Sequence, residues 1–292
     1  MPQLIAPTHI RRRPPSAPTE LALSVARKHT KRRSFVPDHL GWWPVTDHPG
    51  EWCRLAAKDA RGPQILTSPG LSAGQQTSPS HGLALPPAAK GVLPRTLYEQ
   101  LAIHSPIMRL PTPTVWEAAG TAVIRQVVHR DQARVSFQKV CESLGSTVLL
   151  GGEVRYAFPT AERVISAGEG PLRAIGIGFK ARTLLALAEW SLDSHEHLGP
   201  PDLYEALKRV RGVGPWTASV AVCDVCSDYG FYPVEDLAIR AYARNRWGGH
   251  PWPESPAAFA REWRAVTHPH TAEITAFMIA DAILSAAPAT VF

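Results

Sequence analysis

Apolar residues recur every three to four positions through most of the chain from about Leu97 onward, which is the spacing of amphipathic helices. In the segment 113–128, for example, Trp116, Val123 and Val127 fall on one helical face. No internal repeat or coiled-coil heptad accompanies this periodicity. The pattern predicts a mostly α fold of about eight to ten short helices. Helices are expected at 113–128, 131–144, 159–167, 181–191, 201–210, 215–225, 236–247, 256–266 and 271–286.

The helix expected at 131–144 has recognisable end signals. Asp131 is a good N-cap residue, because its carboxylate can accept a hydrogen bond from an unpaired N–H of the first turn. Either Val135 or Phe137 would lie on the buried face. Gly145 is expected to end the helix at the C′ position.

The first 95 residues follow a different pattern. Fourteen of the 28 prolines fall within residues 1–100, and only short strand candidates appear, at 51–56 and 64–67. Residues 1–95 are therefore expected to form either a small, loop-rich β domain or a partly disordered arm, and the sequence leaves both open. Residues 96–292 are expected to form the helical domain.

Composition narrows the class of protein. With 45% hydrophobic and 19% charged residues the chain can bury a core, which excludes wholesale disorder. Residues 1–10 lack the apolar run of a secretory signal, and the apolar stretch 274–287 is too short to span a bilayer and is interrupted by Asp281. Four cysteines do not make a disulfide scaffold. A cytoplasmic protein without membrane contact is expected.

Positive charge is concentrated in the first third of the chain. The formal net charge is +6, of which residues 1–100 carry +7 and the remainder −1. A basic segment of this kind favours a polyanionic partner such as nucleic acid, because binding releases counterions. A solvated basic linker fits the charge equally well.

The most informative segment is 203–218. An amphipathic helix is followed by Gly212-Val213-Gly214-Pro215 and a second helix. Both glycines are expected to permit a tight turn through positive φ, and Pro215 suits the first turn of a helix, where its missing N–H costs nothing. Val213 would fill the core while N–H groups of the turn and the positive end of the second helix face outward. The hairpin is predicted to bind phosphate without reading base sequence.

Asp236 lies 22 residues after Gly214. By itself, an aspartate before a helical pattern is most simply an N-cap. Together, however, the hairpin and the Pro-x-x-Asp-Leu-x-x-Arg pattern at 233–240 resemble the helix-hairpin-helix DNA glycosylase superfamily (HhH-GPD). In that superfamily the essential aspartate lies at this distance. The resemblance implies that Asp236 is catalytic, stabilising positive charge on the sugar and orienting or deprotonating water.

The resemblance covers about residues 105–290 and is nearest to bacterial 3-methyladenine DNA glycosylase II. It implies a two-lobed helical core with a small N-terminal region. Gln126 and Val127 match the residues that enter the duplex where the nucleotide is extruded, whereas Arg125 and His129 stand where that family has small residues, so contacts around the base are expected to differ. The DNA backbone would be anchored by Gly212, Val213, Gly214 and Thr217.

Trp216 occupies the position of the catalytic lysine of bifunctional relatives, two residues after the second hairpin glycine. A Schiff-base step is therefore not expected, and the resemblance implies a monofunctional enzyme with water as the nucleophile. Trp216 is expected either to stack on the extruded base or to pack in the core.

No metal or cofactor is expected to take part in the chemistry. Iron–sulfur relatives carry four cysteines after the aspartate, and this chain has none beyond Cys226. Cys223 and Cys226 form a Cys-x-x-Cys pair, but the further ligands that zinc requires are lacking, which favours simple burial. The resemblance allows a monovalent cation at the hairpin.

These observations predict a monomeric, nucleoid-associated bacterial DNA glycosylase acting in base excision repair on double-stranded DNA. It would flip a damaged or modified base, most simply an alkylated one, and hydrolyse the N-glycosidic bond. Two alternatives stay open. One is a specialised glycosylase for bulky or enzymatically modified bases, motivated by Arg125 and His129. The other is a non-catalytic helix-hairpin-helix protein that binds distorted duplex.

Overall fold

The computed structural model describes residues 53–57, 63–67 and 81–284, the last range with gaps at 106, 110–111, 113, 146, 151–152, 157, 194, 196 and 227. Within this part the chain forms eleven α-helices, two short 3₁₀ helices and six short strands, which pair into three antiparallel two-stranded sheets. The predicted mostly helical fold is therefore confirmed.

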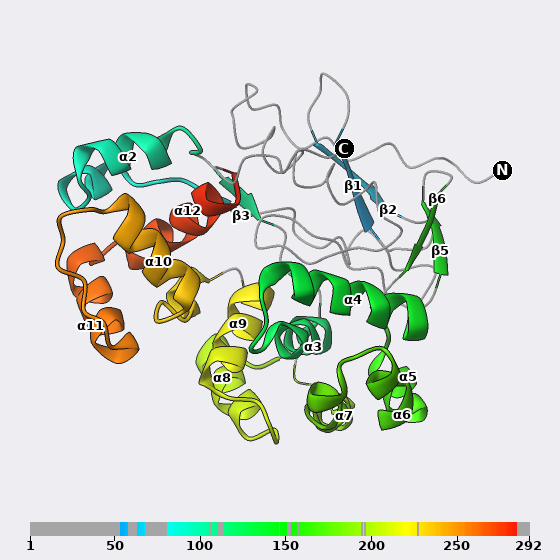
Figure 1. Cartoon of the computed structure of the whole chain (residues 1–292). Coiled ribbons are helices and arrows are strands. Elements are labelled where there is room, and N and C mark those ends of the chain that lie inside the picture. Colours follow the sequence, from blue (N-terminus) through cyan, green and yellow to red (C-terminus); the bar gives the residue numbers. More distant parts are fainter. Residues whose placement is uncertain are drawn as a thin grey trace.

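The helices form two groups, each packed around its own hydrophobic core, with α9 lying between them (Figure 1). From residue 81 on, the described chain runs through the second group, passes through the whole of the first group and then returns to the second, so the predicted two-lobed core is confirmed. The first group comprises α3 (Val115–Arg125), α4 (Arg130–Leu144), α5 (Ala161–Ala167), α6 (Glu169–Ala174), α7 (Gly178–Ser191), α8 (Pro200–Lys208) and α9 (Pro215–Cys226). The second comprises η1 (Pro87–Gly91), α2 (Arg95–Ala102), η2 (Tyr229–Phe231), α10 (Leu237–Arg246), α11 (Pro256–Thr267) and α12 (Thr271–Leu284).

The amino-terminal third is described only in part, and its basic arm lies outside the described residues. Strands β1 (Cys53–Ala57) and β2 (Pro63–Thr67) pair antiparallel, close to the two predicted strands. Strand β3 (His81–Leu83) pairs with β4 (Ile107–Arg109), and Leu85 is buried in the second core. The described residues 85–93 thus pack in the same core as the carboxy-terminal helices, and the division at residue 95 stays a prediction.

The predicted ends of α4 are wrong. The helix begins at Arg130, with His129 rather than Asp131 at the N-cap, because the N–H of Ala133 already bonds to the His129 carbonyl at 2.9 Å. Gly145 is the C-cap itself, in extended backbone, because the chain continues directly into β5 (Thr147–Leu150), which pairs with β6 (Glu153–Tyr156). Phe137 takes the buried position.

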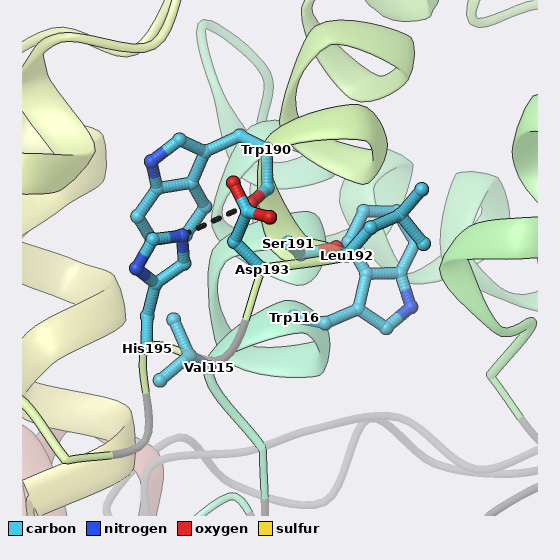
Figure 2. A pocket seen from close by; sticks show the side chains of 7 residues that line it. All are labelled: Val115, Trp116, Trp190, Ser191, Leu192, Asp193 and His195. Atoms are coloured by element: carbon cyan, nitrogen blue, oxygen red, sulfur yellow. Dashed lines mark hydrogen bonds between the residues drawn. The ribbon is translucent and has the colours of Figure 1, made fainter.

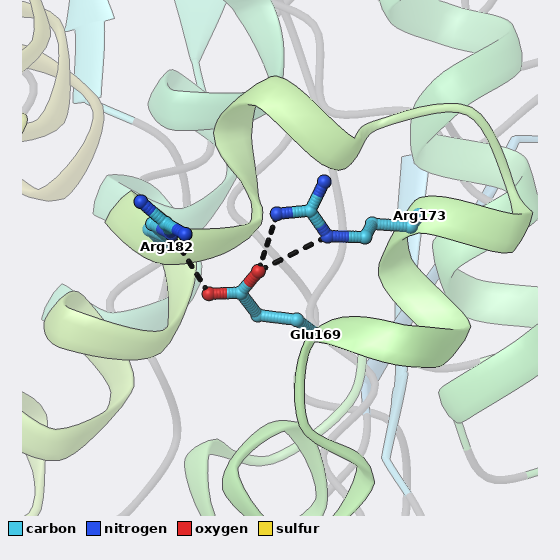
Figure 3. Close-up of polar contacts among 3 residues, drawn as sticks. All are labelled: Glu169, Arg173 and Arg182. Atoms are coloured by element: carbon cyan, nitrogen blue, oxygen red, sulfur yellow. Dashed lines mark hydrogen bonds and ion pairs between the residues drawn. The ribbon is translucent and has the colours of Figure 1, made fainter.

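Helix α6 and the β5–β6 hairpin were not predicted. The sequence Glu169-Gly-Pro reads as a turn, but Pro171 falls in the first helical turn, where no N–H is needed. The Glu169 carboxylate accepts hydrogen bonds from Arg173 in α6 and from Arg182 in α7, and so ties the two helices together (Figure 3). This contact spans the turn from which α7 starts.

Asp281 explains the charge within the apolar helix α12. It is buried and accepts hydrogen bonds from Gln100, at 2.6 Å, and from the Tyr242 hydroxyl, and it lies 2.9 Å from His104 Nε2. The side chain therefore joins α2, α10 and α12 rather than facing solvent. In the described ranges, no helix is long and apolar enough to cross a membrane.

Glu117, in the first group of helices, makes the free energy of unfolding depend on pH. The helix α3 is capped by Thr114, whose Oγ1 accepts from the Glu117 N–H at 3.1 Å, while the Glu117 side chain is only 8% exposed. Burial raises the pKa of this carboxyl from its ordinary 4.5 to about 8. Between these values the unfolded chain loses the proton first, so the free energy of unfolding falls as pH rises.

We expect Glu117→Gln, which keeps the shape without the charge, to remove this dependence. Denaturant unfolding between about pH 5 and pH 8 should show the wild type losing up to about 1.4 kcal/mol per pH unit relative to the variant. Glu189→Gln, at an exposed position of α7, is the matched control and should keep the wild-type slope. Parallel slopes for wild type and Glu117→Gln would contradict the assignment.

Candidate functional site

The hairpin between α8 and α9 is built around Gly212. Its φ is +86°, and a Cβ at this position would lie 2.1 Å from Thr183 Oγ1 in α7, so only glycine fits the turn without strain. Val213 is buried in the first core, as the pattern predicts. Its N–H donates to the Val210 carbonyl at 3.0 Å and therefore points back into the hairpin.

Gly214 does not have the positive φ expected from the sequence, and that expectation is wrong. It stands directly before α9 and its carbonyl accepts from the Ala218 N–H at 3.0 Å, so it begins a normal helical turn. Nothing lies within 4 Å of a Cβ built there, and its N–H has no acceptor among the described residues. The backbone at Gly214 is thus open to close approach from outside.

Gln126 is bound to the hairpin. Its Nε2 donates to Thr217 Oγ1 at 2.6 Å and to the Gly212 carbonyl at 3.2 Å, and the Thr217 side chain is buried by this contact. The structure thus brings together three of the residues predicted for the site. Thr217 has its hydroxyl turned toward Gln126, so a contact between Thr217 and DNA would have to come from its backbone.

Val127 projects from the turn between α3 and α4. It is 96% exposed and has a φ of +53°, the one positive φ outside glycine in the described part of the chain. This conformation is rare for a β-branched residue and costs on the order of 1–3 kcal/mol. Strain of this kind persists where neighbouring contacts fix the backbone, and it clusters at functional sites.

Arg125 and His129 flank this turn in different environments. The Arg125 guanidinium donates to Asp224 Oδ2 in α9 at 2.9 Å, and both side chains are largely buried. His129 is exposed at the N-cap of α4 and caps no N–H with its ring. The Arg125 side chain is therefore held against α9, the helix that lies between the two helical groups.

Asp236 is the half-buried N-cap of α10. Its Oδ1 accepts from the Ala238 N–H at 3.1 Å, and its Oδ2 accepts from the indole Nε1 of Trp216 at 2.9 Å. Asp236 is therefore an N-cap, as the sequence alone most simply indicates, and the fold brings it into contact with the helix that follows the hairpin. Each carboxylate oxygen is held by a donor, one from α10 and one from the start of α9.

Tyr232 is buried close enough to Asp236 and Arg125 for both charges to act on its hydroxyl. Burial is the main reason that the pKa of its hydroxyl is raised well above the usual value; the negative charge of Asp236 raises it further and the positive charge of Arg125 lowers it. The phenol therefore stays protonated beside these two groups. Its role as a neutral hydroxyl at the junction was not predicted from the sequence.

Two further contacts were missed. Trp216 was predicted to stack on the extruded base or to pack in the core; it is partly buried against the first core, and its indole N–H bonds to Asp236, 20 positions away along the chain. Lys180, at the start of α7, is only 2% exposed and donates from Nζ to the Ile124 carbonyl near the end of α3. A lysine in a helical segment ordinarily indicates a solvent-facing position, so the sequence carries no signal for this contact.

A separate surface hollow lies between the start of α3 and the end of α7 (Figure 2). Trp116 and Trp190 line it, and the His195 ring stacks on Trp190 with centroids 3.8 Å apart. Of the predicted site residues, Arg125 lies at the opposite end of α3, and the hairpin packs against the opposite end of α7 at Thr183. Among described residues, no three His, Cys, Asp or Glu side chains are grouped so as to hold a metal ion.

The fold is that of the helix-hairpin-helix DNA glycosylases, although no protein-family model matches the sequence. The 3-methyladenine DNA glycosylase of Archaeoglobus fulgidus superimposes with a TM-score of 0.64 and 19% identity, over 89% of this chain and 93% of that chain. The 8-oxoguanine glycosylase/lyase of Clostridium acetobutylicum in its apo form gives 0.60 and 18%, over 82% and 87%.

A relative is also found by sequence. The DNA-3-methyladenine glycosylase of Bacillus subtilis (strain 168) is 22% identical over 162 residues, covering 49% of this chain and 54% of that protein. The chain thus spans about half the length of this relative. The structural likeness establishes the fold.

The two hairpin glycines should respond differently to alanine. We expect Gly212→Ala to lower the free energy of unfolding by about 2 kcal/mol or more, because it combines positive φ with a clash against Thr183. Gly214→Ala should change stability by less than about 0.5 kcal/mol, because its Cβ meets open space and its φ is normal. Urea denaturation of both variants measures the difference; equal losses would contradict this account of the turn.

Proposed function

We propose that the protein is a monofunctional DNA glycosylase that extrudes a damaged or modified base from duplex DNA and hydrolyses its N-glycosidic bond with Asp236. The observation that carries the proposal is the Asp236 carboxylate, which is held by Trp216 and the Ala238 N–H beside the hairpin. Fold similarity to DNA glycosylases with different base specificities supports the same class of reaction.

The chemistry requires a fixed negative charge. When an N-glycosidic bond breaks, positive charge develops on the deoxyribose, and a preorganised carboxylate lowers the energy of that state. The position of Asp236 at the start of α10 places its carboxylate at the positive end of the helix dipole. With one donor on each oxygen, the carboxylate keeps lone pairs with which to orient or deprotonate a water molecule.

The hairpin and the neighbouring turn supply the DNA contacts. The open backbone at Gly214 allows a phosphate to approach the amino end of α9 without a side chain in the way. Val127 is then in place to fill the gap left by the extruded base, with Gln126 linking it to the hairpin. Phosphate binding at Gly214 and insertion of Val127 thus act on the same stretch of DNA backbone. One copy of the protein provides both contacts.

Water is the proposed nucleophile. The position of the lysine used by glycosylase/lyases is Trp216, whose indole nitrogen cannot form a Schiff base and instead donates to Asp236. An alkylated base is the proposed substrate class, supported by the similarity to two 3-methyladenine glycosylases.

The proposal is tested by Asp236→Asn, because asparagine keeps the N-cap and the shape while removing the charge. We expect release of free base from a mixed-lesion duplex, followed by mass spectrometry, to fall by about 100-fold or more, with binding to the same duplex retained. Wild-type product strands should break only after hot alkali, since no lyase step is expected.

Asp228→Asn provides the matched control, because Asp228, at an exposed position, is also an N-cap aspartate that accepts a hydrogen bond from a backbone N–H, that of Gly230 at 2.8 Å. Its activity should equal that of the wild type. Equal base release by wild type and Asp236→Asn would rule out the catalytic role, and binding without any base release by the wild type would favour a non-catalytic DNA-binding protein. Strand breakage without alkali would contradict the monofunctional assignment.

Val127 should show opposite effects on stability and activity. Val127→Gly removes the backbone strain at an exposed site, so we expect the free energy of unfolding to rise by roughly 1 kcal/mol. The same variant cannot fill the emptied stack, and base release should fall by about tenfold, equivalent to about 1.4 kcal/mol. Thermal unfolding and single-turnover kinetics measure the two effects. Unchanged kinetics in the stabilised variant would remove Val127 from the mechanism.

A further inference from the structure

The first two turns of α7 touch both parts of the proposed DNA-binding surface. Thr183 packs against the hairpin at Gly212. Lys180, one turn earlier, donates from Nζ to the carbonyl oxygen of Ile124, near the end of α3. The start of α7 is therefore a common support for the hairpin and for the turn that carries Val127.

The contact made by Lys180 falls where α3 needs a donor. The last four carbonyl groups of a helix have no partner within the helix, and a cation near them also complements the negative end of the helix dipole. Ile124 is buried, so water does not supply that donor, and Lys180 is itself only 2% exposed. The Phe179 ring, with its centroid 5.0 Å from Nζ, adds a cation–π contact.

The turn after this carbonyl is held from two sides. Lys180 fixes the end of α3 from α7, and Gln126 fixes the next residues from the hairpin. Val127 follows with positive φ and an almost fully exposed side chain, so its own packing cannot maintain the conformation. The strain must therefore be balanced by contacts of the neighbouring residues.

We propose that Lys180 is a positioning residue that holds the α3–α4 turn in its strained form, so that Val127 enters the duplex. Lys180 acts through the Ile124 carbonyl and does not itself contact DNA. The inference rests on the proposed function and deepens it by assigning a residue to the extrusion step. Because burial lowers the pKa of Lys180 to about 8, keeping the ammonium at this site is costly, which argues for a specific role beyond filling space.

The test is a double-mutant cycle between Lys180→Met and Val127→Gly, read by the fluorescence of 2-aminopurine placed beside the lesion, which reports unstacking. We expect Lys180→Met to reduce unstacking and single-turnover base release by about tenfold, with affinity for undamaged duplex within about twofold of wild type. In the Val127→Gly background the same substitution should have little further effect, because the group that Lys180 positions is already gone.

Lys90→Met, at an exposed position of η1, is the matched control and should resemble wild type. Lys180→Gln retains an N–H donor and should lie between wild type and Lys180→Met; it also keeps the test open should the methionine variant fail to fold. Wild-type unstacking by Lys180→Met, or equal losses in both backgrounds, would overturn the role of Lys180 while leaving the glycosylase proposal intact. A wild type that neither unstacks nor releases a base would overturn both proposals.

Discussion

The hydrogen bond from the Trp216 indole to the Asp236 carboxylate joins the two lobes at the proposed reaction centre. Trp216 lies in the first turn of α9, which packs in the first core, while Asp236 caps α10, which packs in the second. A carboxylate at a helix N-cap has one donor from its own helix; the second donor, from the other lobe, fixes its orientation. The position of the charge therefore depends on how both cores pack, which is the preorganisation that electrostatic catalysis requires.

The remaining site residues form one connected unit around the same junction. Gln126 binds the hairpin through Thr217 and Gly212, and α7 supports both the hairpin and the end of α3. A phosphate bound at Gly214 and a side chain inserted at Val127 would thus be set at a fixed spacing from the carboxylate. Such a fixed arrangement lets binding energy be used for base extrusion and not for ordering the protein.

Much of this organisation follows from local sequence signals, and the rest depends on tertiary contacts. Helical spacing, Pro215 and an apolar residue between two glycines predicted the hairpin, since these signals act within a few residues. The normal φ of Gly214 and the N-cap at His129 were mispredicted, because a residue type permits a conformation without imposing it. The bond from Trp216 to Asp236 joins distant segments, which no local pattern encodes.

In the proposed mechanism, the Asp236 carboxylate stabilises positive charge at the sugar. The most direct measurement compares the affinity of wild type and Asp236→Asn for two duplexes, one with a cationic pyrrolidine in place of the deoxyribose and one with a neutral tetrahydrofuran abasic site. Since an enzyme binds its transition state more tightly than its substrate, the wild type should prefer the cationic duplex by about tenfold or more, and the variant should lose that preference. Equal affinity of the wild type for the two duplexes would contradict the account.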